Sequence, residues 1–126
     1  MFRSFEDLEV WGRACNLAVR VYAVTKPSRD FALNGQMQRA AVSIASNVAE
    51  GSERPPKDFA RFLAMARGSA AELRTQTYIA AKIKMIRPDE MREIVEECKK
   101  IAKMLFGLSK SLKPKTENRK PKTERD

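Results

Sequence analysis

The cations of this chain are its main candidates for contact with another molecule. The sequence holds 25 Lys and Arg against 16 Asp and Glu, for a net charge of +9. Many of these cations are three, four or seven positions apart, so in a helix they point the same way. The candidates chosen on such spacing, or on clustering at a segment end, are Arg13, Arg20, Lys57, Arg61, Lys82, Lys84, Arg87, Arg92, Lys99, Lys103 and Lys110. Rows of positive charge attract polyanions such as nucleic acid.

Groups that could perform catalysis or bind a metal are scarce. The sequence contains no histidine, and its two cysteines, Cys15 and Cys98, lie 83 positions apart. This composition argues against His-based metal sites, paired-cysteine zinc sites and Ser-His-Asp or Cys-His nucleophiles. Glu72 is a lone carboxylate without a partner base. We therefore expect no enzyme, no cofactor and no metal site, and we expect both cysteines to pack as small hydrophobic residues.

Proline and glycine divide the chain into four segments of helical character. The breaks fall at Pro27, Gly51 with Pro55, and Pro88. The predicted helices cover about residues 4–26, 30–50, 56–84 and 88–112. Ser4 followed by Asp7 resembles a capping box at the first of them. Pro56 and Pro88 suit the first turn of a helix, where a missing N–H is no loss.

Apolar residues recur at three- and four-residue steps within each segment. In the last segment they form a heptad seam, which favours packing at a shallow angle: Ile94, Cys98, Ile101, Leu105, Leu108 and Leu112. In the first segment the predicted inward stripe is Phe5, Leu8, Trp11, Cys15, Ala18 and Tyr22. Gly51 is expected just beyond a helix end in the left-handed conformation, and Gly68 at a tight helix crossing.

These patterns predict an all-α protein, an antiparallel up-down-up-down four-helix bundle over residues 1–112. Residues 113–126 contain a tandem seven-residue repeat, Lys-Pro-Lys-Thr-Glu-Asn-Arg followed by Lys-Pro-Lys-Thr-Glu-Arg-Asp, without an apolar residue. We expect this basic tail to be disordered, because it has no apolar surface to bury. No apolar run is long enough to span a membrane and no signal peptide is evident, so we expect a cytoplasmic protein.

Polar residues also form a stripe beside the apolar one in the second and third segments. They are Arg39, Ser43, Asn47, Ser69 and Glu72. Asn and Ser are mediocre helix formers, so their place among good helix formers calls for a reason. We expect a structural network in which Arg39 pairs with Glu72 and Asn47 or Ser43 reaches the third helix. The alternative is a small polar site.

The stretch from Gln38 to Gly51, Gln-Arg-Ala-Ala-Val-Ser-Ile-Ala-Ser-Asn-Val-Ala-Glu-Gly, resembles the signature of the four helix bundle protein family. This family is also called the 23S rRNA intervening-sequence protein family. Further matches are Phe5-x-x-Leu8-x-x-Trp11, Val21-Tyr22, Phe59-x-x-Phe62-Leu63 and Gly68-Ser69-x-x-Glu72-Leu73. The pair Pro55-Pro56 departs from the pattern, which puts the local turn in question.

The resemblance implies a bacterial bundle that assembles as a ring-like homopentamer. Some relatives are encoded inside insertions in ribosomal RNA genes. Similar proteins, the accessory variability determinants of diversity-generating retroelements, bind nucleic acid and a reverse transcriptase through a basic surface. A surplus of large apolar residues also favours self-association: Trp11, Phe62, Met65, Met104 and Phe106.

Two functions follow from these observations. The first is a basic, self-associating scaffold that binds RNA or DNA. No exposed set of aromatic residues is evident for base stacking, so we expect little sequence preference. The alternative is a protein-interaction or structural scaffold without direct nucleic-acid binding, whose partner is another protein such as a reverse transcriptase. Against binding stands the interpretation of the charges as an ordinary solvated surface, which is favoured by the acidic residues interleaved with the lysines of the last segment, Glu93, Glu96 and Glu97.

Overall fold

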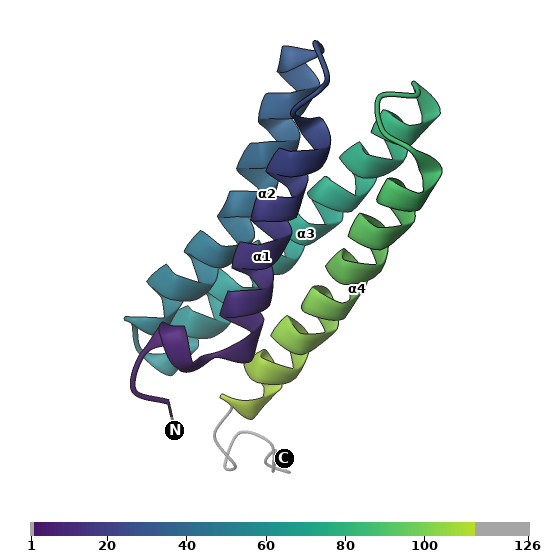
Figure 1. Ribbon diagram of the computed structural model, residues 1–126. Coiled ribbons are helices and arrows are strands. Elements are labelled where there is room, and N and C mark those ends of the chain that lie inside the picture. The colour runs from purple at the N-terminus through teal and green to yellow at the C-terminus, as the bar shows by residue number, and fades with distance from the viewer. Residues whose placement is uncertain (1, 113–126) are drawn as a thin grey trace.

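The structure, a computed structural model, describes residues 2–112. Within this range, four antiparallel α-helices form a bundle (Figure 1). A 3-10 helix η1 (Phe5–Asp7) precedes α1 (Glu9–Thr25), α2 (Phe31–Ser52), α3 (Pro56–Lys82) and α4 (Pro88–Ser111). Consecutive helices run in opposite directions and lie side by side, and α4 returns to lie beside α1. No strand occurs in residues 2–112. The predicted all-α, up-down-up-down four-helix bundle is confirmed, while the predicted tail at 113–126 lies outside the described residues.

Proline and polar caps set the helix boundaries. Pro56 and Pro88 are the first residues of α3 and α4, as predicted. The Asp30 carboxylate accepts a hydrogen bond from the Leu33 N–H at 3.1 Å and caps α2. The Glu90 carboxylate accepts one from the Arg87 N–H at 2.9 Å, the reach-back half of a capping box.

The first predicted segment is two elements, not one helix. Ser4 caps η1 by accepting a hydrogen bond from the Glu6 N–H at 3.2 Å. Leu8 then adopts an extended conformation (φ −82°, ψ 122°), so α1 begins only at Glu9. This bend lets the ring of Phe5 contact the ring of Trp11 edge-on, with 5.1 Å between their centres.

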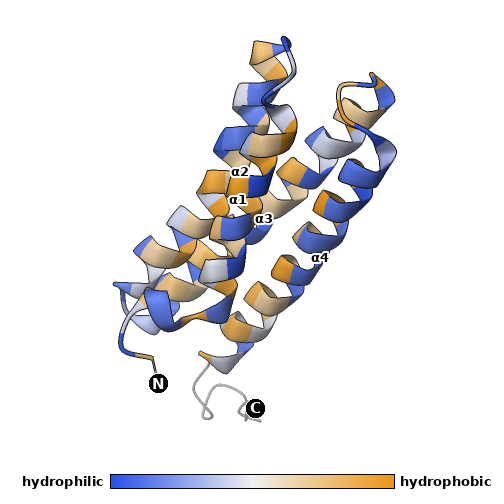
Figure 2. Cartoon of the chain, viewed as in Figure 1, coloured by the Kyte–Doolittle hydropathy of each residue, from blue (hydrophilic) through white to orange (hydrophobic). Residues whose placement is uncertain are grey.

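The core lies along the axis of the bundle, and its α4 side confirms the predicted seam. Ile94, Cys98, Ile101 and Leu105 are each at most 1% exposed. Hydrophobic and hydrophilic segments alternate along this helix in Figure 2, as expected when one face packs inward. Within residues 2–112, no helix combines the length and hydropathy that crossing a bilayer requires.

The predicted inward stripe of the first helix is confirmed only in part: Ala18 is buried, but most of the buried residues lie about one position away from the predicted stripe. The buried residues of α1 are Val10, Ala14, Leu17, Ala18, Val21, Val24 and Thr25. Trp11 and Cys15 are only partly buried, and Tyr22 is 50% exposed. The apolar residues of α1 form two adjacent stripes with helical spacing, and the one rich in valine faces the core.

Both glycine predictions are also wrong. Gly51 lies inside α2 with an ordinary negative φ. A Cβ built on Gly51 would lie 2.6 Å from the Phe62 Cβ and 3.0 Å from the Phe59 Cδ1, so its absence lets α2 and α3 approach. Gly68, by contrast, has nothing within 4 Å of its Cβ position. The close crossing is therefore at Gly51.

Lys84 takes the left-handed conformation instead, with φ 64°, in the turn between α3 and α4. The Lys84 N–H donates to the Ala81 carbonyl at 3.0 Å, and the Met85 N–H donates to the Ala80 carbonyl at 2.8 Å. These two bonds form a Schellman motif, which satisfies the last carbonyls of α3. The motif ends α3 two residues earlier than predicted.

Candidate nucleic-acid interface

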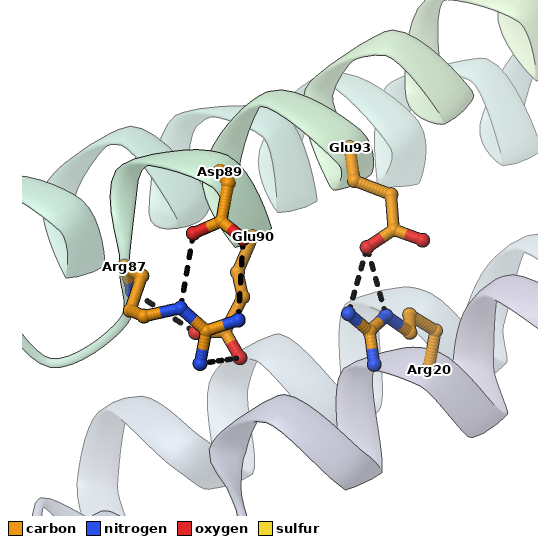
Figure 3. Close-up of polar contacts among 5 residues, drawn as sticks. All are labelled: Arg20, Arg87, Asp89, Glu90 and Glu93. Atoms are coloured by element: carbon orange, nitrogen blue, oxygen red, sulfur yellow. Dashed lines mark hydrogen bonds and ion pairs between the residues drawn. The ribbon is translucent and has the colours of Figure 1, made fainter.

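Two of the predicted binding residues, Arg13 and Arg20 on α1, are engaged by carboxylates of α4. The Arg13 guanidinium binds Glu97 through two hydrogen bonds of 2.9 and 2.8 Å. Arg20 binds one carboxylate oxygen of Glu93 through Nε at 2.9 Å and Nη2 at 2.8 Å (Figure 3). The hydrogen bond to Glu97 is the main cause that raises the pKa of Arg13. Both of these predicted binding residues are therefore paired, and their charges join α1 to α4.

Three more predicted cations have acidic partners on their own helix or at its cap. Arg87 binds Asp89 at 3.0 Å and Glu90 at 3.3 Å beside the start of α4 (Figure 3). Its hydrogen bond with Asp89 raises the pKa of Arg87 and lowers that of Asp89. The other two pairs, Arg61 with Asp58 at 3.5 Å and Lys99 with Glu96 at 3.8 Å, are longer and exposed. Exposed pairs of this kind contribute little to stability.

The remaining predicted cations form no ion pair with a described residue. They are Lys57, Lys82, Lys84, Arg92, Lys103 and Lys110, and all are exposed. Lys57 lies at the start of α3, while Lys82 and Lys84 lie at and just beyond its other end. The three others lie on α4. The predicted set is therefore not one surface, and among its members without an ion pair to a described residue, only Arg92, Lys103 and Lys110 follow one another along a helix face.

Two arginines that the sequence analysis did not choose, Arg67 and Arg74, lie on the side of α3 that faces α4. They lie seven residues apart on α3 and line a small groove of about 70 Å³ against α4. The Arg67 guanidinium carbon lies 5.2 Å from the ring centre of Phe106, and the Lys110 ammonium lies 5.6 Å from it. Neither Arg67 nor Arg74 forms an ion pair within residues 2–112. The seven-residue step between them was the available signal.

We call this surface the α3–α4 basic face. It consists of two rows of cations at helical spacing, which meet at the ring of Phe106: Arg67 and Arg74 on α3, and Arg92, Lys99, Lys103 and Lys110 on α4. Lys99 is the one member with an ion pair to a described residue. The face therefore holds a net positive field that the paired cations of α1 lack.

Cys98 lies at the bottom of the same groove and is 1% exposed. Burial raises the pKa of the Cys98 thiol to about 12, so almost none of it is thiolate near neutral pH. Burial also raises the pKa of Cys15, which is only partly buried. Within residues 2–112, no three His, Cys, Asp or Glu residues are grouped so that they could bind a metal ion.

We therefore expect iodoacetamide at pH 8 to leave Cys98 unmodified in the folded protein and to modify it after unfolding in guanidinium chloride. Peptide mass spectrometry measures both states. The denatured sample is the control for intrinsic reactivity. Rapid labelling of Cys98 in the folded state would contradict its role as a core residue.

The predicted polar network exists in part. The hydroxyls of Ser43 on α2 and Ser69 on α3 share a hydrogen bond of 2.8 Å. The Asn47 amide donates to the Ser43 carbonyl at 2.9 Å and to its hydroxyl at 3.1 Å. The predicted pair between Arg39 and Glu72 is absent among the described residues, and both side chains are exposed. Exposure explains the difference, because water solvates both charges without an ion pair.

A family described as 23S rRNA-intervening sequence protein matches residues 6–107. The chain belongs to this family. Its fold is also similar to that of a crystal structure of a protein with unknown function from the S23 ribosomal protein family of Bacteroides thetaiotaomicron. The TM-score is 0.75 at 23% sequence identity, and the match covers 80% of this chain and 98% of the other. A comparison with curated proteins finds no match.

Most residues that carry the resemblance to the 23S rRNA-intervening sequence proteins serve packing. Phe59 and Phe62 are buried and adjoin Gly51, and Ser69 bonds to Ser43 across the same helix pair. The motif therefore accounts for the close contact of α2 with α3. It does not include the α3–α4 basic face.

The large apolar residues that suggested self-association divide between core and surface. Phe62 is 8% exposed, whereas Met65 and Phe106 are 47% and 51% exposed. Trp11 and Met104 are partly buried and pack against the core. Trp11 also lines an apolar groove of about 410 Å³ between α1 and α2, together with Phe5, Cys15, Ala18, Val42, Ala45, Ser46 and Ala49.

Proposed function

We propose that this member of the 23S rRNA-intervening sequence protein family is a non-enzymatic, self-associating helical scaffold that binds nucleic acid with little sequence preference. The observation that carries the proposal is the α3–α4 basic face. Five of its six cations have no acidic partner among the described residues. Cations left without carboxylates bind the phosphates of a polyanion and release its counterions.

The geometry of the face supports contact with the sugar-phosphate backbone of a nucleic acid. Lys103 and Lys110 lie seven residues apart on α4, and Arg67 and Arg74 lie seven apart on α3. Each such pair spans about 10 Å along its helix. The face therefore has the shape of a strip, which suits a chain of phosphates better than a single small anion. Such contacts fix position without reading sequence.

Self-association would repeat this face around the assembly. The proposal of a homo-oligomer rests on the apolar groove between α1 and α2 and on large exposed apolar residues such as Val19 and Phe31, which are 69% and 75% exposed. A pentamer is the size that the family resemblance implies. Light scattering at micromolar concentration should give a multiple of the 14.3 kDa chain mass, and a monomer mass would contradict this part of the proposal.

Fluorescence anisotropy with labelled RNA and DNA strands of differing sequence tests the binding. We expect all strands to bind at 50 mM salt with similar affinity. With six phosphate contacts, affinity should fall by roughly 10²-fold or more between 50 and 200 mM salt. Absence of binding at 50 mM salt, or affinity indifferent to salt, would refute the proposal.

A second candidate function is a protein scaffold without nucleic-acid binding, and the α1–α2 apolar groove favours it. Its apolar lining suits a helix of another protein, of which a reverse transcriptase is the example that the resemblance supplies. A stoichiometric protein partner that remains bound after nuclease treatment would support this function. If, in addition, none of the RNA and DNA strands binds, the protein scaffold would replace nucleic-acid binding as the proposed function.

A further inference from the structure

We infer that the α3–α4 basic face contains a base-stacking site centred on Phe106, and that the preferred ligand is therefore single-stranded nucleic acid. The inference rests on the proposed function and adds the class of ligand. It corrects the expectation from sequence that no exposed aromatic set is available. Phe106 is 51% exposed although it is a large apolar residue at the surface of α4.

The surroundings of Phe106 are those of a stacking site rather than of a core residue. The Arg67 guanidinium carbon lies 5.2 Å from its ring centre and the Lys110 ammonium 5.6 Å from it. Bases stack on aromatic rings and on the guanidinium planes of arginine. Phe106 and Arg67 therefore offer two planar surfaces for a base, with Lys110 beside them for a phosphate.

A second aromatic residue extends the site. Arg67, Arg74 and Tyr78 follow one another on α3 at steps of seven and four, so they share a face. Tyr78 is 41% exposed. It lies eleven residues from Arg67, which is about 16 Å along the helix. Several nucleotides span this distance.

Cations of the face adjoin each of these two aromatic residues along its own helix. Lys99 and Lys103 precede Phe106 on α4 at steps of seven and three, and Arg74 lies between Arg67 and Tyr78 on α3. Aromatic residues interleaved with phosphate-binding cations are typical of proteins that bind single strands. Paired bases in a duplex are stacked on one another and are not available for such contacts.

The test compares an oligodeoxythymidine of about twelve nucleotides with an abasic strand of equal length and charge, because stacking needs bases and phosphate contacts do not. The full chain should bind the oligodeoxythymidine at least 5-fold more tightly than the abasic strand or a duplex of the same length. Phe106→Ala should weaken oligodeoxythymidine binding by about 5- to 100-fold and leave binding of the abasic strand unchanged. Phe106→Trp should retain the preference.

Tyr22→Ala is the matched control. It removes an aromatic ring of α1, outside the α3–α4 basic face, whose exposed fraction of 50% is close to the 51% of Phe106, and it should change neither affinity. Equal affinity of the wild-type protein for the two strands would overturn the stacking site and leave the proposed function intact. So would an equal loss for both strands in Phe106→Ala. Failure of the wild-type protein to bind either strand would instead refute the proposed function.

Discussion

Replacement of Arg67, Arg74, Lys103 and Lys110 with glutamine is expected to weaken binding of single-stranded nucleic acid by roughly 10²-fold at 0.15 M salt. Each lost phosphate contact removes about 0.7 from the slope of log affinity against log salt concentration, so this variant should show a slope that is shallower by about 3. Lys103 and Lys110 are exposed, Arg67 and Arg74 are partly exposed, and none of the four has an acidic partner among the described residues, so glutamine should leave the fold intact. Anisotropy titrations at several salt concentrations measure both quantities.

A variant that loses the same number of charges at other positions distinguishes the contribution of the α3–α4 basic face from the effect of net charge. Lys26, Arg29, Arg39 and Lys57 are exposed cations outside the α3–α4 basic face and form no ion pair with a described residue. Their replacement with glutamine should lower affinity far less, through the long-range field alone. If both variants lose affinity equally, binding is a property of the whole charge and the α3–α4 basic face is not a site.

Gly51→Ala is expected to destabilise the protein by about 1–3 kcal/mol, although alanine favours a helix by about 1 kcal/mol over glycine. The new methyl group would lie 2.6 Å from the Phe62 Cβ. That atom is fixed to the α3 backbone, so the clash is relieved only if α2 and α3 separate. Such a movement would also disturb the buried residues beside them, of which Leu63 is 0% exposed. Denaturant unfolding followed by circular dichroism measures the change.

Gly68→Ala is the paired control. Gly68 is also inside a helix but is exposed, with nothing within 4 Å of its Cβ position. Only helix propensity should then act, and stability should rise by up to about 1 kcal/mol. A stabilising effect of Gly51→Ala would show that α2 and α3 are not in close contact there.

The fold was predictable because its signals are local. Proline at the first position of α3 and α4, and the heptad seam from Ile94 to Leu105, act within one helix. Local signals could not predict which of Gly51 and Gly68 lies at the close contact between helices. Both are glycines in helices, and their difference depends on the phenylalanines of another helix that face Gly51.

The candidate site was predicted less well, for the same reason. Spacing showed that Arg13 and Arg20 share a side of α1, but the carboxylates that bind them come from α4. Spacing applied equally to Arg67 and Arg74, which line a groove against α4. Whether Phe106 is exposed also depends on the packing of the whole bundle. It lies three residues after Lys103, and this spacing is compatible with an exposed position or with a position at the edge of the buried face.

The most direct test of the α3–α4 basic face is the location of contacts on the full-length protein. Ultraviolet cross-linking to a strand that carries 4-thiouridine, followed by peptide mass spectrometry, identifies the residues next to the bases. We expect adducts in the peptides that contain Arg67, Tyr78 and Phe106, and loss of these adducts at high salt. Adducts confined to α1 and α2 would contradict the assignment of the binding surface to α3 and α4.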